Sequence, residues 1–157
     1  KRLARRLTEM LPEDGMLIVI CGHNEKLYES LLELGNRSNL RVLGFTKDVP
    51  AYMDAADLML TKPGGISVTE AASMRLPMVF IDAVSGCEEY NKDFFLRTGG
   101  AVTGQTPREI ARTSLKLLSN EPALEKMGDA LGAAVPQNAA ANILSEMSAA
   151  EEEGDLA

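Results

Sequence analysis

The chain contains no tryptophan, only one histidine and only two cysteines. Cys21 and Cys87 lack the spacing of a metal-binding or redox motif, so they indicate a reducing, cytoplasmic setting. The longest apolar run covers only residues 16–21, whereas a membrane-spanning helix needs roughly 20 apolar residues. The first residues also lack the pattern of a signal peptide. These absences exclude a membrane-spanning chain and give no support for a structural metal site.

Negative charge is concentrated at one end of the chain. The formal net charge is -7, but residues 146–157 alone carry five acidic residues and no basic one. The rest of the chain is nearly balanced, with 16 basic and 18 acidic residues. No basic stripe with interleaved aromatic residues is present, so nucleic acid is not an expected partner. One basic cluster has helical spacing and can be read as a solvated face, a phosphate site or a membrane-proximal patch: Lys1, Arg2, Arg5 and Arg6.

The regular part of the sequence alternates short apolar runs with helical patterns. With 157 residues, 45% of them hydrophobic and 25% charged, it has the size and composition of one folded domain. The apolar runs predict strands at residues 16–21, 40–43, 58–60, 78–81 and 101–102. The other segments predict helices at residues 25–34, 49–55, 67–75, 88–98, 107–119, 122–131 and 138–148. Because the strands are continuously apolar, we predict an α/β domain with a doubly wound parallel sheet.

The two ends of the chain depart from this pattern. The chain has no initiator methionine and begins inside an amphipathic helical pattern, so we expect it to be a piece of a longer protein. That pattern is carried by Leu3, Leu7, Met10 and Leu11. We expect one domain over residues 1–149, followed by an acidic, disordered tail over residues 150–157.

Polar and flexible residues follow the predicted strands. In an open parallel sheet, ligands bind at the carboxyl ends of the strands. The loops at those ends are rich in Gly, Ser, Thr, Asn and carboxylates, and they cover residues 22–24, 44–46, 61–65 and 82–89. We therefore expect a polar pocket that is formed by these four loops on one edge of a rigid sheet.

The third of these loops allows two interpretations. The Pro-Gly-Gly sequence at residues 63–65 ends a strand, and Ser67 is expected to begin a helix. The free amides of such a helix start can bind phosphate. Ser67 and Glu70 also have the spacing of a capping box, in which the Glu70 carboxylate accepts a hydrogen bond from the Ser67 amide without any ligand. The local pattern favours neither interpretation.

A longer stretch resembles a known family. Residues 44–80 read GFTKDVPAYMDAADLMLTKPGGISVTEAASMRLPMVF, and the likeness continues in CGHNEKL at residues 21–27 and EEYN at residues 88–91. The order of Lys-Pro-Gly-Gly, hydroxyls, Glu and Leu-Pro within residues 61–77 is rarely met elsewhere. The chain thus resembles the C-terminal donor domain of family-28 glycosyltransferases. Within that family it is most similar to the diacylglycerol glycosyltransferases, including monogalactosyldiacylglycerol synthases.

The resemblance implies one half of a GT-B enzyme, in which two Rossmann-like domains face each other across a cleft. It places the N-terminal acceptor domain outside this chain, together with the first strand of the present domain and its glycine-rich loop. The implied reaction is inverting transfer of a hexose from a UDP-sugar to a membrane lipid, with diacylglycerol as the expected acceptor. The UDP-sugar is a substrate, and no cofactor or metal is implied.

The general base of the family belongs to the N-terminal domain. This chain alone is therefore expected to carry no catalytic residue and to be inactive. The lipid acceptor would be reached through the missing domain, and the full-length protein is expected to be cytoplasmic and peripheral on the inner face of the cell membrane.

Carried over residue by residue, the resemblance implies a nucleotide site. The uracil would lie against the backbone of Phe45 and Thr46, and the ribose hydroxyls would donate to Glu70, as ribose does to acidic residues in dinucleotide folds. The diphosphate would meet the start of the following helix at Gly64, Gly65 and Ser67, with Lys62 and Thr69 as further phosphate contacts. Lys62 can equally face solvent.

The implied donor-sugar site consists of Cys87, Glu88 and Asn91. Cys87 stands where the family has Gln, and a thiol cannot offer the paired donor and acceptor of an amide. The sugar therefore stays open between glucose, galactose and N-acetylglucosamine. Asn91 can serve either in ligand contact or in helix packing. His23 precedes a helix opened by Asn24, and we interpret it as a polar residue at the opening of that helix rather than as a base.

Three other functions stay open. The chain could be an N-acetylglucosaminyltransferase of peptidoglycan lipid intermediates, although that enzyme usually has Arg-Ser-Gly-Ala where this chain has Thr-Lys-Pro-Gly-Gly. It could be a non-catalytic donor half that docks to a partner subunit. A UDP-sugar epimerase shares the architecture but would need catalytic carboxylates and a histidine that the sequence does not place.

Overall fold

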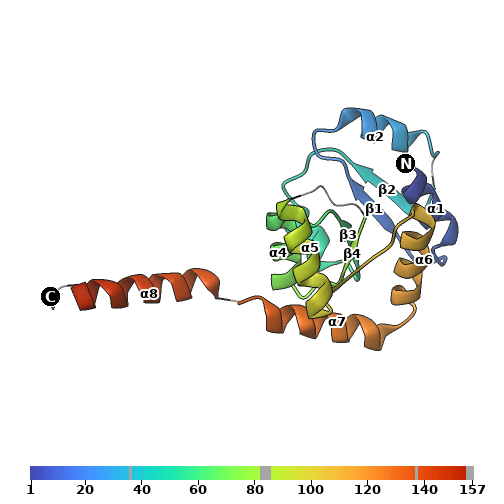
Figure 1. Ribbon diagram of the computed structural model, residues 1–157. Helices are drawn as coiled ribbons and strands as arrows, with labels where there is room; N and C mark the ends of the chain where they lie inside the picture. Colours follow the sequence, from blue (N-terminus) through green and yellow to red (C-terminus); the bar gives the residue numbers. More distant parts are fainter. Residues whose placement is uncertain (36, 82–85, 137, 155–157) are drawn as a thin grey trace.

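Figure 1 shows the computed structural model, which describes residues 1–35, 37–81, 86–136 and 138–154. Its strands are β1 (Leu17–Ile20), β2 (Leu40–Leu43), β3 (Met59–Thr61), β4 (Met78–Phe80) and β5 (Ala101–Thr103). Its helices are α1 (Arg2–Met10), α2 (Glu25–Leu32), α3 (Val49–Asp54), α4 (Gly65–Ser73), α5 (Cys87–Thr98), α6 (Pro107–Leu118), α7 (Glu121–Ala134) and α8 (Ala139–Gly154). Every strand and helix predicted from the sequence is therefore present.

The strands pair in parallel, as predicted, but they form two sheets. In the first sheet β1 pairs with β2, so that Leu17 lies opposite Leu40. In the second sheet β4 lies between β3 and β5, with Met78 opposite both Met59 and Ala101. Within the described residues no strand pairing joins the two sheets. The predicted parallel pairing is therefore present, in two separate sheets of the described residues.

Helices cover both sides of the three-stranded sheet. Figure 1 shows β3 and β4 between α4 and α5 on one side and α6 on the other. Helix α6 contacts β4 and α1, whereas α4 contacts β3 and α5 contacts β5. This arrangement confirms the predicted Rossmann-like α/β class.

Each sheet has its own hydrophobic core. All three residues of β4 are at most 1% exposed, as expected of a strand covered on both faces. The larger core consists of Met53, Val68, Ala71, Ala72, Leu76, Met78, Phe80, Phe95, Ala101 and Leu131. The smaller core contains Ala4, Cys21 and Leu31 and lies against β1 and β2. Strand β1 is less buried than β4, since Ile18 is 37% exposed.

Polar side chains begin several helices. The Asn24 side chain accepts a hydrogen bond from the amide of Leu27 at 3.0 Å, which confirms Asn24 as the start of α2. Thr106 and Asn120 cap α6 and α7 in the same way. Both of these helices also carry a proline in the first turn, where its missing N–H costs no intrahelical hydrogen bond.

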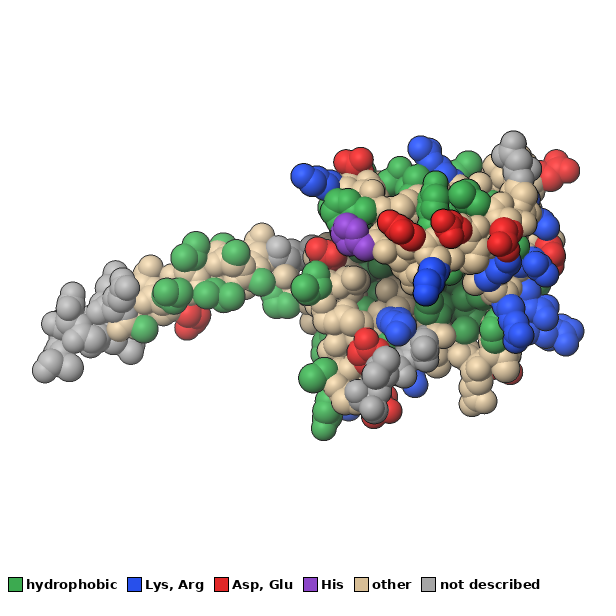
Figure 2. All heavy atoms as spheres, turned by 90° about the horizontal axis from the view of Figure 1, so that it is seen from above, with side chains coloured by type: hydrophobic (Ala, Val, Ile, Leu, Met, Phe, Trp, Pro, Cys, Tyr) green, Lys and Arg blue, Asp and Glu red, His purple; other side chains and the backbone are tan. Residues whose placement is uncertain are grey.

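Helix α8 extends away from the rest of the domain (Figures 1 and 2). Its apolar side chains are exposed, with Ile143, Leu144 and Met147 at 57–64%. The helix continues to Gly154. In the described part of the chain, no helix is both long and apolar enough to cross a membrane.

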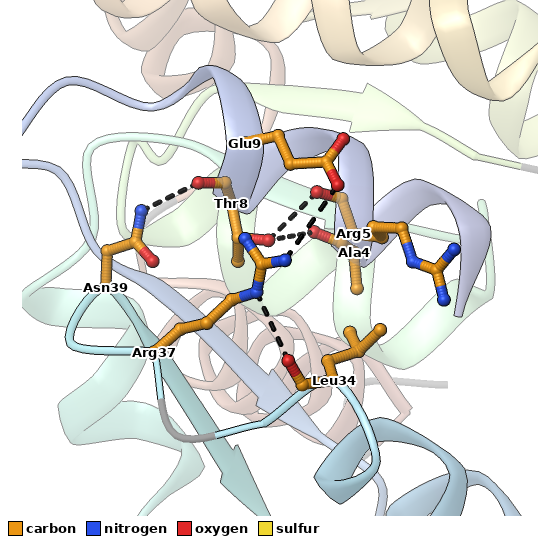
Figure 3. A network of polar contacts seen from close by, with 7 residues as sticks. All are labelled: Ala4, Arg5, Thr8, Glu9, Leu34, Arg37 and Asn39. Carbon is orange, nitrogen blue, oxygen red and sulfur yellow. Dashed lines mark hydrogen bonds and ion pairs between the residues drawn. The ribbon is translucent and has the colours of Figure 1, made fainter.

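Helix α1 is joined to the β1–β2 half by polar contacts at the amino ends of the strands (Figure 3). The side-chain amide of Asn39 donates to the Thr8 carbonyl at 2.8 Å. The Arg37 guanidinium lies 3.9 Å from the Glu9 carboxylate and donates to the Leu34 carbonyl at 3.3 Å. A surface depression of about 580 Å³ lies beside this network, at the end of the strands opposite to the expected site.

The basic cluster of α1 is largely exposed. Arg2, Arg5 and Arg6 face solvent, and the Lys1 ammonium donates to the Glu33 carboxylate. This hydrogen bond, together with the charge of Lys1, holds the pKa of Glu33 below its usual range. This contact links the start of α1 to the end of α2.

Two glycines on α7 differ in what an added methyl group would meet. A Cβ on Gly128 would lie 2.8 Å from the backbone carbonyl oxygen of Arg75, whereas one on Gly132 would lie 2.6 Å from the Arg75 side-chain Nε. That side chain is 61% exposed and can move. We predict that Gly128→Ala lowers the free energy of unfolding by about 1–3 kcal/mol through overpacking.

Gly132→Ala is the matched control. It should be neutral or stabilise the domain by up to about 1 kcal/mol, because alanine favours helix over glycine. Urea unfolding of the two variants checks the prediction, and equal losses of stability would contradict it.

Candidate functional site

The candidate site lies in the loops at the carboxyl ends of the strands, and its described contacts form two groups. The first group joins the loops after β1 and β2, where the rings of His23 and Phe45 stack. The second group joins the loop after β3 to α5, through a hydrogen bond from Asn91 to Pro63. Residues 82–85 of the fourth predicted loop lie outside the described residues.

Helix α4 begins two residues earlier than the sequence predicted. Gly64 is its N-cap residue, with extended backbone angles and no side-chain cap, and Gly65 is its first helical residue. Ser67 therefore lies inside the first turn and cannot cap the helix. Of the two interpretations left open for Ser67 and Glu70, the capping box is excluded, because the glycine pair lets the backbone turn into the helix before Ser67 is reached.

The start of α4 offers unpaired backbone donors. The first amides of any helix have no intrahelical partner. Among the described residues, the amides of Gly65, Ile66 and Ser67 donate to no protein group, whereas the Gly64 amide donates to the Lys62 carbonyl at 2.8 Å. Gly65, Ile66 and Ser67 are all exposed. This helix start is thus open to an anion.

Polar side chains around α4 differ in whether they are available to contact a ligand. Lys62, Ser67 and Glu70 are exposed, so each can contact a ligand. Thr69 is also exposed, but its hydroxyl donates to the Gly65 carbonyl at 2.7 Å. Because this hydroxyl has only one proton, it cannot also donate a hydrogen bond to a phosphate in this conformation.

The loops after β1 and β2 bring two aromatic rings together. The rings of His23 and Phe45 stack with centroids 4.6 Å apart and planes 18° apart, although Phe45 is 60% exposed. Gly22 precedes His23 with a φ of 56°, in the left-handed region that favours glycine. The Thr46 hydroxyl oxygen accepts a hydrogen bond from the Asp48 amide at 3.1 Å.

The His23–Phe45 stack was missed by the sequence reasoning. The sequence indicates for His23 only a polar residue at the opening of α2, and the structure adds a specific ring contact. The available signal was positional, because each residue follows a glycine at the end of neighbouring strands, with Ile20 and Leu43 in register.

Helix α5 carries the residues expected to contact a donor sugar. It begins at Cys87, after Gly86 with a φ of 97°, and Cys87 is exposed. Glu88 is half-buried in the first turn. Asn91 is half-buried one turn along, and its amide Nδ2 donates to the Pro63 carbonyl at 3.0 Å. Of the two readings left open for Asn91, the structure thus shows a packing contact.

No metal site is evident in the described part of the chain, where no cluster of three or more His, Cys, Asp or Glu residues could hold an ion. The two thiols differ in environment. Burial raises the pKa of the Cys21 thiol, whereas Cys87 is exposed at the start of α5.

A family model described as "Glycosyl transferases group 1" matches residues 2–131. The chain belongs to this glycosyltransferase family. The domain is also 36% identical over 127 residues to the "Processive diacylglycerol beta-glucosyltransferase" of Bacillus subtilis (strain 168), a match covering 78% of this chain and 33% of that protein. The glycosyltransferase domain thus spans about a third of that relative's length. The predicted similarity to diacylglycerol glycosyltransferases is confirmed.

Solved structures support the same fold. The glycosyltransferase domain matches the crystal structure of Acinetobacter baumannii MurG with a TM-score of 0.73 and 21% identity, over 94% of this chain and 45% of that one. A putative UDP-N-acetylglucosamine 2-epimerase from Listeria monocytogenes matches with a TM-score of 0.79 and 20% identity, over 97% of this chain and 40% of that one. At these identities the likeness shows the fold alone.

Different exposure of the two thiols should make their alkylation rates different. At neutral pH we predict fast reaction of Cys87 with iodoacetamide and slow reaction of Cys21, whose burial both blocks access and depletes the thiolate. Mass spectrometry of the labelled peptides measures both rates. A Cys87→Ser variant should lose the fast phase, and a fast phase that persists would contradict the predicted difference.

Proposed function

We propose that this chain is the donor-binding domain of an inverting glycosyltransferase that transfers a hexose from a UDP-sugar to diacylglycerol. The observation that carries the proposal is the uncapped start of α4, with exposed Glu70 one turn further along. The Bacillus subtilis relative is named a processive diacylglycerol beta-glucosyltransferase, which supports a lipid acceptor and favours glucose among the sugars left open.

The diphosphate of the donor binds at the Pro-Gly-Gly loop, residues 63–65, and the first turn of α4. Amides of Gly65 and Ser67 donate to the phosphate oxygens, and the positive end of the helix dipole favours their charge. Gly64 has open space where a side chain would lie, which allows phosphate to approach the backbone. The Lys62 ammonium and the Ser67 hydroxyl add charge and a further donor.

The nucleoside lies between the two groups of loops. Glu70 accepts hydrogen bonds from the two ribose hydroxyls, which a carboxylate can do with both oxygens. The uracil lies against the backbone of Phe45 and Thr46, beside the exposed ring of Phe45. The donor sugar extends toward Cys87, Glu88 and Asn91 on α5.

In the transfer step, the acceptor hydroxyl oxygen bonds to the anomeric carbon as the bond from that carbon to UDP breaks. The acceptor proton passes to a base in another domain of the full-length protein, and the electron pair of the broken bond leaves with UDP. This domain stabilises the charge that develops on the diphosphate, using preorganised amides and hydroxyls at the start of α4. Such stabilisation acts mainly in the transition state.

The full-length protein completes the site from outside this chain. A strand preceding α1 would fit between β1 and β3, which have no pairing with each other among the described residues. It would join the two sheets and bring a further loop to the diphosphate. An N-terminal domain would supply the base and the lipid site, and would hold the protein at the inner face of the cell membrane.

Changing Glu70 should weaken nucleotide binding. In the full-length protein, we predict that Glu70→Gln lowers the affinity for UDP about tenfold, because a hydrogen bond to a charged acceptor is replaced by a neutral one. The matched control is Glu125→Gln, which makes the same change at an exposed position of α7. Isothermal titration with UDP, UDP-glucose and ADP measures the affinities.

ADP should bind more weakly than UDP to the unmodified protein. The proposed function would be refuted by a full-length protein that binds neither UDP nor UDP-glucose. If the Glu70→Gln and Glu125→Gln variants bound UDP with equal affinity, Glu70 would not be part of the nucleotide site.

A further inference from the structure

Asn91 connects two segments that lie 28 residues apart in the sequence. Its side-chain amide donates to the Pro63 carbonyl at 3.0 Å, between α5 and the Pro-Gly-Gly loop. A Cβ added to Gly65 would lie 3.8 Å from the same Nδ2 atom, so the amide also lies near the first residue of α4. The hydrogen bond thus restrains the peptide unit directly before the helix start.

Apart from the burial of the Pro63 side chain, the Pro-Gly-Gly loop has few other restraints. Two adjacent glycines give its backbone more conformational freedom than other residues would. The N-cap residue Gly64 supplies no side-chain cap. In the described part of the chain, Asn91 is the only side chain beyond β3 and α4 that forms a hydrogen bond with this loop. The direction of the free amides of α4 is therefore set in part by Asn91.

From this geometry we infer that Asn91 is a positioning residue, which acts through the Pro63 carbonyl to hold the start of α4 ready for the diphosphate of a nucleoside diphosphate donor. The inference rests on the proposed function. Asn91 lies on the same helix as Cys87 and Glu88, so this hydrogen bond also links the proposed sugar-binding helix to the proposed diphosphate loop. Such preorganisation lowers the entropic cost of ligand binding.

This role makes a distinctive prediction for UDP, which lacks the sugar. A residue that only touched the sugar would change the affinity for UDP-glucose and leave UDP unaffected. A substitution of a positioning residue changes the affinities for both ligands. In the full-length protein, Asn91→Ala should lower the affinities for UDP and for UDP-glucose alike, by about fivefold. This is the effect expected from the loss of one neutral hydrogen bond.

Two variants separate positioning from folding. Asn91→Ala places a strong helix former in α5, which offsets part of the stability lost with the hydrogen bond to Pro63. Asn91→Asp keeps the shape of the side chain but cannot donate a hydrogen bond to the Pro63 carbonyl. It should therefore lower the affinity for UDP at least as much as Asn91→Ala does. Asp93→Ala is the matched control, because Asp93 is exposed two residues along the same helix. Thermal unfolding confirms that each variant is folded at the titration temperature.

Isothermal titration decides between the outcomes. Weaker binding of both ligands by the folded Asn91 variants, with Asp93→Ala unchanged, supports the inference. Loss of affinity for UDP-glucose alone, or no loss for either ligand, overturns it and leaves the proposed function intact. Absence of UDP binding by the unmodified full-length protein overturns the proposed function and this inference with it.

Discussion

Parallel pairing of the strands is the constraint on which the candidate site depends. Because neighbouring parallel strands end on the same edge, the loop after β1 meets the loop after β2, and the loop after β3 meets α5. The pairing is stabilised by burial, most clearly at β4, whose three residues are at most 1% exposed. Without that rigid edge, the glycine-rich loops would have no defined direction.

The division into two sheets also divides the site. The His23–Phe45 stack belongs to the β1–β2 half, whereas the Pro-Gly-Gly loop and Asn91 belong to the half built on β3, β4 and β5. Each half has a separate core, so each can preserve its own local geometry. In the proposed function, one nucleotide spans both halves, with its base on the first and its diphosphate on the second.

Much of the fold could be predicted from the sequence, because apolar runs and helix-start residues are local signals. The strands, and the start of α2 at Asn24, follow from them. The start of α4 could not be predicted in the same way. Ser67 and Glu70 have capping-box spacing, yet Gly64 begins the helix earlier, because backbone freedom at glycine competes with a side-chain cap. The Pro-Gly-Gly loop itself was found from the sequence as a candidate site.

The sequence by itself determined the α/β class, the order of the elements and, through the motif within residues 61–77, membership of a glycosyltransferase family. Only the tertiary structure decided that His23 stacks on Phe45 and that Asn91 donates to Pro63. The physical reason is that these contacts join residues far apart in the chain. They depend on strand register and helix packing, which local patterns of apolar residues, caps and turns do not specify.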